Sequence, residues 1–199
     1  MNENSDEFER IKFSLDEIEL HGLAKGNENK DVVLCLHGWL DNAASFIPLM
    51  NSLENKHVIA IDWPGHGHSS HRGQDAHYHF IDYVYDLVLL FEHHNWQSID
   101  IVAHSMGGMI ASAFVAAFPE KVNSLTLLDS IGFISAKAEE TTGQLRSGML
   151  SRLKLKLKGK KKPIHSDLES AINARKNVSD LSYQDAKLIV ERGSLKLDN

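Results

Sequence analysis

Short apolar runs and longer amphipathic stretches follow one another along the chain. Residues 8–24 alternate apolar and polar positions, a pattern that predicts two half-buried strands at the edge of a sheet. Four further apolar runs predict buried strands that are covered by helices, and they span residues 32–36, 58–61, 99–103 and 122–128.

Apolar residues at helical spacing fill the segments between these strands. Asp41 and Asn42 offer N-terminal caps before an apolar face that includes Phe46. Residues 80–91 repeat apolar positions at helical spacing, and residues 106–118 are apolar on nearly all sides. Strands that alternate with helices in this order predict an α/β fold with a doubly wound, mostly parallel sheet.

The character of the chain changes after Asp129, because no further β-branched apolar run follows it. Residues 166–169 (SDLE) form a capping box ahead of one predicted helix, and Ser182 caps a second helix that ends at Arg192 and Gly193. We therefore expect residues 1–129 to form an α/β core and residues 130–199 to form a helical cap segment.

Charge and cysteine content narrow the class of protein. The 199 residues include 27 acidic and 21 basic ones, a net charge of −6 that disfavours general nucleic-acid binding. A single cysteine, Cys35, excludes an internal disulfide framework. The acidic residues 1–7 lack the pattern of a secretory signal, and the apolar stretch at 109–118 is far shorter than the roughly 20 residues that span a bilayer. We expect a cytoplasmic protein without a membrane span.

The strongest chemical signal is the hexapeptide AHSMGG at residues 103–108, between a predicted strand and a predicted helix. It matches the G-x-S-x-G nucleophile elbow, with Ala103 in place of the first glycine. Ser105 would occupy a strained turn that projects its hydroxyl beyond the sheet, and Gly107 would keep the next turn free of a colliding side chain. A serine that merely caps a helix is the alternative, which the flanking strand and helix disfavour.

Two backbone N–H groups are candidates for an oxyanion hole. Met106 follows the serine at a helix N-terminus, where the helix dipole favours negative charge. Trp39 follows Gly38 at the end of an earlier strand, and Gly38 would let the backbone approach the developing charge. We expect His37 and His104 to line the pocket, and the place of His104 on the elbow makes it unsuited to be the base.

Three motifs make the chain similar to the α/β-hydrolase superfamily, namely HGWLDNA at 37–43, DWPGHGHS at 62–69 and HSMGG at 104–108. The first motif, with Asp129 at a strand end and ERG at 191–193, more narrowly resembles the serine hydrolase-like proteins. The resemblance covers nearly the whole chain. It is specific for the fold and weak for the substrate, because these enzymes share motifs across esters, thioesters, amides and C–C bonds.

The family orders its catalytic triad as serine, acid and histidine, with the histidine on a loop after the last strand. After Ser105 this chain has one histidine, His165, which follows no predicted strand. The resemblance therefore implies that the sequence stops inside or just after the cap, and that on the order of 60 to 100 further residues would carry the histidine and an acid. Asp129 is a possible catalytic acid, and a locally hydrogen-bonded aspartate is the alternative.

The resemblance implies acyl transfer, in which Ser105 attacks a carbonyl, the amides of Trp39 and Met106 hold the oxyanion, and water releases the acyl group. We expect a small acyl ester as the substrate, no cofactor, and little turnover from these residues alone. Thioester and C–C bond hydrolysis stay open. So do a non-catalytic α/β-hydrolase-like binding protein and a fragment whose hydrophobic edge at 122–128 favours association.

Two other clusters of side chains are candidate ligand-binding sites. Five histidines and Asp75 could suit a metal, but their spacing fits no preformed site, so we expect solvated loop histidines and no metal; they are His66, His68, His71, His77 and His79. The run at 152–162 holds seven cations and no acid, and anionic lipid or nucleic acid could bind it. We favour an exposed stretch of the cap whose lysine stems cover apolar surface.

Overall fold

The computed structural model of the chain describes residues 8–73, 76–133, 135, 137–158 and 163–197. The acidic N-terminal residues 1–7, Asp75 and residues 159–162 of the basic run lie outside the described residues. The helices and strands follow in the order β1 (Glu9–Leu15), β2 (Ile18–Lys25), β3 (Val32–Leu36), η1 (Ala43–Phe46), α1 (Ile47–Met50), β4 (His57–Ile61), α2 (Phe80–His94), β5 (Ile99–His104), α3 (Met106–Ala117), η2 (Pro119–Lys121), β6 (Val122–Leu128), η3 (Ala138–Glu140), α4 (Thr141–Lys158), α5 (Leu168–Lys176) and α6 (Tyr183–Gly193).

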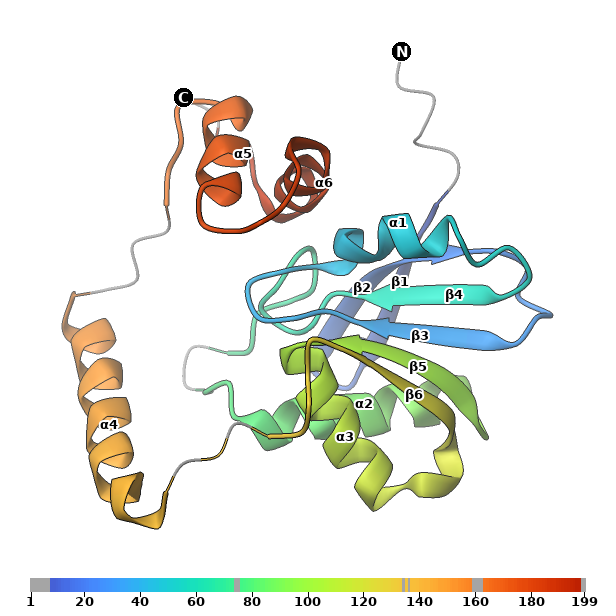
Figure 1. The fold of residues 1–199 in the computed structure, drawn as a ribbon, viewed down its shortest axis with the longest axis horizontal. Helices are drawn as coiled ribbons and strands as arrows, with labels where there is room; N and C mark the ends of the chain where they lie inside the picture. Colours follow the sequence, from blue (N-terminus) through green and yellow to red (C-terminus); the bar gives the residue numbers. More distant parts are fainter. Residues whose placement is uncertain (1–7, 74–75, 134, 136, 159–162, 198–199) are drawn as a thin grey trace.

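Six strands form one sheet in the order β1-β2-β4-β3-β5-β6 (Figure 1). The β1–β2 and β2–β4 pairs are antiparallel, whereas the β4–β3, β3–β5 and β5–β6 pairs are parallel. The predicted α/β fold with a mostly parallel sheet is confirmed. Because the parallel strands share one direction, their carboxyl ends meet on one side of the sheet, where open α/β sheets bind ligands.

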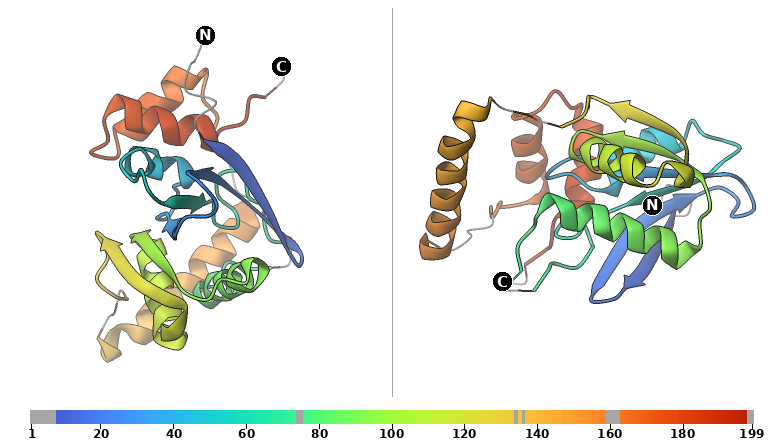
Figure 2. Two further views of the ribbon diagram at one scale, coloured as in Figure 1. Left: turned by 90° about the vertical axis from the view of Figure 1, so that its right-hand side faces the viewer. Right: turned by 90° about the horizontal axis from the view of Figure 1, so that it is seen from below.

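Alternation along the strands sends apolar side chains to two clusters, one on each face of the sheet. On β3, Leu34 and Leu36 belong to the cluster that contacts α2 and α3. Val33 and Cys35 belong to the cluster that contacts η1, α1 and, through Leu188, α6. Figure 2 shows helices on both sides of the sheet. This double coverage explains why the central strands are apolar on both faces.

Two capped segments differ from their predicted form. The apolar segment after Asn42 is the 3₁₀ turn η1 followed by the single-turn helix α1, with Asn42 as the N-cap. At α5 the predicted capping box is wrong by one residue. Asp167, not Ser166, is the N-cap, because its Oδ1 accepts the N–H of Ser170 at 2.7 Å. A carboxylate at that place also faces the positive end of the helix dipole.

The described chain after β6 is helical, as predicted, and Ser182 caps α6. The helices α5 and α6 pack against each other, and α6 packs on η1. The helix α4 stands away from the sheet in Figure 1 and in the right-hand view of Figure 2. The division into a core and a cap at residue 129 stays a prediction.

The strand β6 forms the second edge of the sheet. Its Leu127 and Leu128 side chains are 36% and 40% exposed. An uncovered parallel edge strand offers unpaired backbone groups and apolar side chains to another chain. Association through this edge stays a prediction.

The described ranges hold neither a bilayer-spanning helix nor a cluster of metal ligands. None of their helices is long and apolar enough to cross a bilayer. No three His, Cys, Asp or Glu side chains gather there as a group that could hold a metal ion. Of the loop histidines, His66 is buried, and its Nδ1 lies 3.2 Å from the carbonyl oxygen of Pro64.

The thiol of Cys35 should be unreactive in the native protein. Its side chain is fully buried, and burial raises its pKa to about 12, so the reactive thiolate is scarce. Ellman's reagent should react with less than about 0.1 thiol per native chain. After denaturation in urea it should react with the single thiol of the sequence. Rapid titration of the native chain would show that this face of the sheet is open.

Candidate active site

Ser105 occupies a strained turn between β5 and α3. Its φ is 47° and its ψ is −115°, a backbone conformation that residues with a Cβ rarely adopt. Two backbone hydrogen bonds hold the turn. The Ser105 N–H donates to the carbonyl oxygen of Leu128, and the Met109 N–H donates to that of Ser105, each at 3.1 Å. The turn has the strand before it and the helix after it that a nucleophile elbow requires.

Two glycines are needed because other parts of the chain crowd this turn. A Cβ on Gly107 would lie 2.3 Å from the carbonyl oxygen of Leu36, at the end of β3. A Cβ on Gly38 would lie 2.9 Å from Nδ1 of His104 and 3.2 Å from the Cβ of Ser105. The loop after β3 and the turn after β5 therefore touch each other, and only glycine leaves room for the contact.

Two backbone N–H groups at this contact are free to donate. Met106 is the first residue of α3, and the first N–H groups of a helix have no intrahelical acceptor. Trp39 follows Gly38 and precedes Leu40, whose φ is 58°. Neither N–H donates to another described residue. Their role as oxyanion donors stays a prediction.

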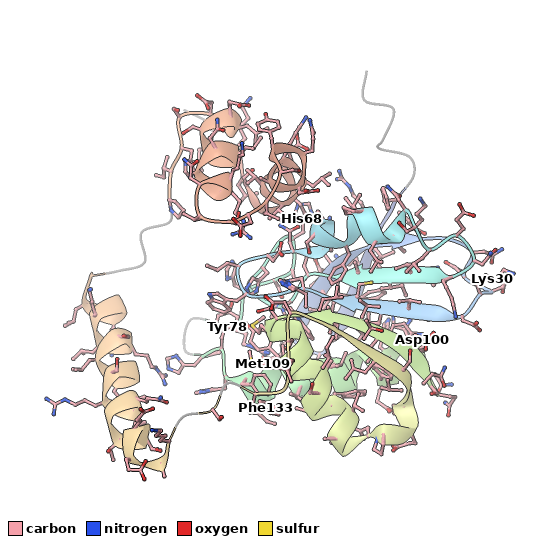
Figure 3. The ribbon with its side chains drawn as sticks, in the orientation of Figure 1. Lys30, His68, Tyr78, Asp100, Met109 and Phe133 are labelled. Carbon is pink, nitrogen blue, oxygen red and sulfur yellow. The ribbon has the colours of Figure 1, made fainter. Side chains whose placement is uncertain are left out.

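Ser105 also lines an open hollow of about 170 Å³ at the carboxyl edge of the sheet. Figure 3 shows two of its lining residues next to each other, Met109 from α3 and Phe133 from the segment after β6. Among the other lining residues, Ile131 is fully exposed and Ser130 and Asp129 are polar. The hollow thus combines an apolar wall with two serines and one carboxylate.

Asp129 directly follows β6 and has a positive φ of 46°, close to the φ of 47° that Ser105 has after β5. Its side chain is exposed and lines the same hollow as Ser105. It forms no hydrogen bond with another described residue, so the alternative of a locally bonded aspartate gains no support there. A carboxylate in this position is free to orient a partner group.

His37 is not among the residues that line this hollow, and its predicted place in a substrate pocket stays a prediction. It is fully buried below the site, where Nε2 accepts the N–H of Trp63 at 2.9 Å. Because that nitrogen accepts, Nδ1 carries the proton and donates to the carbonyl oxygen of Gly38 at 2.7 Å. Burial lowers the pKa of His37 to about 3. The neutral ring joins the loops after β3 and β4.

His104 and His165 are also separate from the hollow. The half-buried ring of His104 lies against Gly38 and is not among the residues that line the hollow. His165 is exposed between α4 and α5. No described histidine forms a hydrogen bond with Ser105. Among the described residues, Ser105 therefore has no histidine placed to take its proton.

Sequence reasoning missed the wall formed by residues 130–133. These residues follow no motif, and only their approach to α3 places them in the site. One local signal was available in the second glycine of the elbow. A Cβ on Gly108 would lie 2.5 Å from Oγ of Ser130, so this glycine marks a close contact with the segment after β6.

Residues 31–170 match the model of a family described as having the alpha/beta hydrolase fold. The chain belongs to this family. It is 36% identical over 183 residues to a serine hydrolase-like protein of Danio rerio, which is 90% of this chain and 56% of that protein. It is 32% identical over 170 residues to serine hydrolase-like protein 2 of Homo sapiens, 83% of this chain and 54% of that protein. The narrower resemblance stated above is confirmed.

Solved structures agree with this assignment. The crystal structure of a hypothetical protein from Pseudomonas aeruginosa is 34% identical, with a TM-score of 0.89 over 96% of this chain and 67% of that one. The chain spans about half the length of the two curated relatives. What those longer proteins do as a whole can be transferred to this chain only as a proposal.

Substitution Gly107→Ala should destabilise the fold by about 3 kcal/mol or more, because the new Cβ meets a backbone carbonyl that cannot move. Gly148→Ala is the matched control. Gly148 lies in α4 with no atom within 4 Å of the added Cβ, so alanine there should stabilise the helix by up to about 1 kcal/mol. Urea unfolding measures both. Equal effects would mean that the turn is not crowded.

Stability should fall as the pH drops below 6.5, in part because of His37. The pKa of His37 is about 3 in the folded chain, against 6.5 for a solvated histidine, so the unfolded chain binds a proton first. The stabilisation is complete above 6.5 and is lost as the pH falls from 6.5 towards 3, by about 2 kcal/mol between 6.5 and 5. Urea unfolding at a series of pH values measures this slope, which should be shallower in His37→Gln. An unchanged slope would contradict the assignment.

Proposed function

We propose that the chain carries the nucleophile and the oxyanion hole of a serine hydrolase that acts on small acyl esters. The observation that carries this proposal is the strained Ser105 turn at the wall of a hollow, beside two backbone N–H groups that have no acceptor among the described residues. Membership of the α/β-hydrolase family and the names of the serine hydrolase-like relatives support a hydrolase. The single buried cysteine fits the reducing cytoplasm, which is the location we propose.

The first chemical step is attack by the Ser105 hydroxyl oxygen on the carbonyl carbon. A C–O bond forms, the π electron pair moves to the carbonyl oxygen, and the serine proton leaves to a base. The N–H groups of Trp39 and Met106 bind the resulting oxyanion, and one such donor is worth roughly 10²–10³ in rate. The positive end of α3 adds to this stabilisation. Loss of the alcohol gives an acyl-serine, which water then hydrolyses.

Proton transfer limits what this chain does by itself. A serine hydrolase passes the serine proton to a histidine, which returns it to the leaving alcohol. Asp129, on the wall that Ser105 shares, is the acid we propose to orient that histidine. Loss of a triad member typically costs roughly 10⁴-fold in rate, so we propose that this chain turns over little substrate without a histidine from elsewhere.

The hollow favours a small, uncharged acyl group. Met109, Ile131 and Phe133 supply apolar wall, and its one ionisable lining residue in the described part of the chain is the acidic Asp129, which would repel an anionic substrate. A thioester is the second candidate. A thioesterase domain from the curacin biosynthetic pathway is 25% identical, with a TM-score of 0.78 over 93% of this chain. A non-catalytic binding protein would instead leave Ser105 unreactive.

The proposal predicts that p-nitrophenyl acetate acylates Ser105. Nitrophenol release should reach at most about one equivalent per chain, because deacylation needs the same missing base. Intact mass should show one added acetyl group. Ser105→Ala should abolish both signals, whereas Ser130→Ala, which changes a second serine of the same hollow, should retain them. Release that persists in Ser105→Ala would contradict the proposal. A thioester that reacts faster than the matched ester would favour the second candidate.

A further inference from the structure

The carboxylate of Asp62 is a buried junction between the two loops at the carboxyl ends of β3 and β4. The side chain of Asp62 is 0% exposed. Its Oδ1 accepts the N–H of Ala43 at 2.7 Å, and its Oδ2 accepts the N–H of His68 at 2.9 Å. Ala43 begins η1, directly after the loop that holds Trp39. The Asp62 carboxylate therefore fixes the carboxyl end of the loop of residues 38–42, which presents the Trp39 N–H.

Arg192 from the last turn of α6 pairs with this carboxylate across 130 residues of sequence. Its Nε donates to Oδ1 and Oδ2 at 3.0 and 3.1 Å, and its Nη2 donates to Oδ2 at 2.7 Å. The Arg192 side chain is 7% exposed. Figure 3 labels His68 below the α5–α6 pair, which marks the place of this contact. A forked guanidinium fixes direction as well as distance, which a lysine cannot do.

A second contact joins α6 to the same loop. The Asn42 side chain donates from Nδ2 to the carbonyl oxygen of Ile189 at 2.8 Å, and its Oδ1 accepts the N–H of Ala44 at 3.1 Å. Gly193 lies so near that a Cβ on it would be 3.2 Å from Nδ2 of Asn42. One side chain thus connects the cap of η1 to the backbone of α6.

The loop between these anchors is exposed at Trp39 and Leu40. At its start the carbonyl oxygen of Gly38 accepts from His37. In its middle the Trp39 and Leu40 side chains are 59% and 67% exposed, and Leu40 has a positive φ. One ring contact is made from the middle of the loop, where the Trp39 ring meets the buried His66 ring edge to face with 5.3 Å between centroids. The hydrogen bonds of the loop to neighbouring elements lie at its two ends. The amino end is fixed by His37 and the carboxyl end by Asp62 and α6.

We propose that Arg192 is a positioning residue for the oxyanion hole, because through Asp62 and Ala43 it fixes the loop that presents the Trp39 N–H. This inference rests on the proposed function only in giving that N–H the role of oxyanion donor. The helix α6 follows all six strands in the sequence, and through Arg192 it helps to position the candidate active site. Arg192 touches no reacting atom, so its effect is on the order of the loop.

Backbone hydrogen exchange of the 199-residue chain tests the inference without any catalysis. Arg192→Lys keeps the charge and loses the fork. It should speed exchange in residues 38–44 by at least about tenfold, beyond any change in the strands of the sheet. Arg72→Lys is the matched control, because Arg72 forms a comparable pair with Asp86, with side chains 13% and 3% exposed. Arg72→Lys should leave exchange in residues 38–44 unchanged, even where it lowers the melting temperature as much as Arg192→Lys does.

Asn42→Asp provides a second test that does not depend on the stability of Arg192→Lys. The aspartate keeps the oxygen that caps η1 and loses the donor to Ile189, so exchange should again rise in residues 38–44. Unchanged exchange in this segment, or an equal rise in Arg72→Lys, would overturn the inference. The readout uses unreacted protein, so failure of Ser105 to react with esters would refute the proposed function and leave this result intact.

Discussion

The backbone of Ser105 keeps its positive φ only because three strand ends hold it there. The Ser105 N–H is bonded to the end of β6, and Gly107 is pressed against the last carbonyl of β3. A strained residue of this kind typically costs about 1–3 kcal/mol, and it persists where the surroundings over-determine it. The parallel pairing of β3, β5 and β6 supplies that constraint, since it brings these ends into register at one edge. The backbone conformation of the half-buried Ser105 therefore depends on the pairing of the strands.

Around this turn the molecule separates buried polar structure from open apolar surface. His37 and Asp62 are fully buried, and each joins the loop after β3 to the loop after β4. On the other side of the turn, Ile131 and Phe133 are exposed at the hollow, and β6 leaves two leucines at an open edge. In the proposed function, the buried polar groups position the backbone donors and the apolar surface receives the acyl group.

Local patterns in the sequence were enough for most of the fold. The period-2 alternation that splits the side chains of β3 between two clusters is visible in the sequence, as is the helix that follows the AHSMGG motif. The N-cap of α5 was misplaced by one residue because Ser166 and Asp167 are both good caps, and only the backbone decides between them.

Long-range contacts account for what sequence reasoning missed. His37 resembles a pocket residue in the sequence, and its burial depends on Trp63, 26 residues later. The pairing of Asp62 with Arg192 joins two motifs that were singled out separately for their resemblance to the family, and no periodicity connects them. The wall at 130–133 lacks any pattern at all. Gly108, which lies against Ser130, is the one local signal noted above for this wall, and the contacts of His37 and Asp62 depend on how the sheet brings distant segments together.

Labelling with a fluorophosphonate probe, followed by peptide mapping, tests the central claim that the sheet presents Ser105 as a nucleophile. The phosphonate forms a stable bond with a reactive serine, so slow reaction without a histidine is still detected. The account predicts one label per chain, on the peptide that contains Ser105, and its loss when the chain is unfolded in urea before the probe is added. No label after prolonged exposure, or labelling of several serines at similar rates, would contradict it.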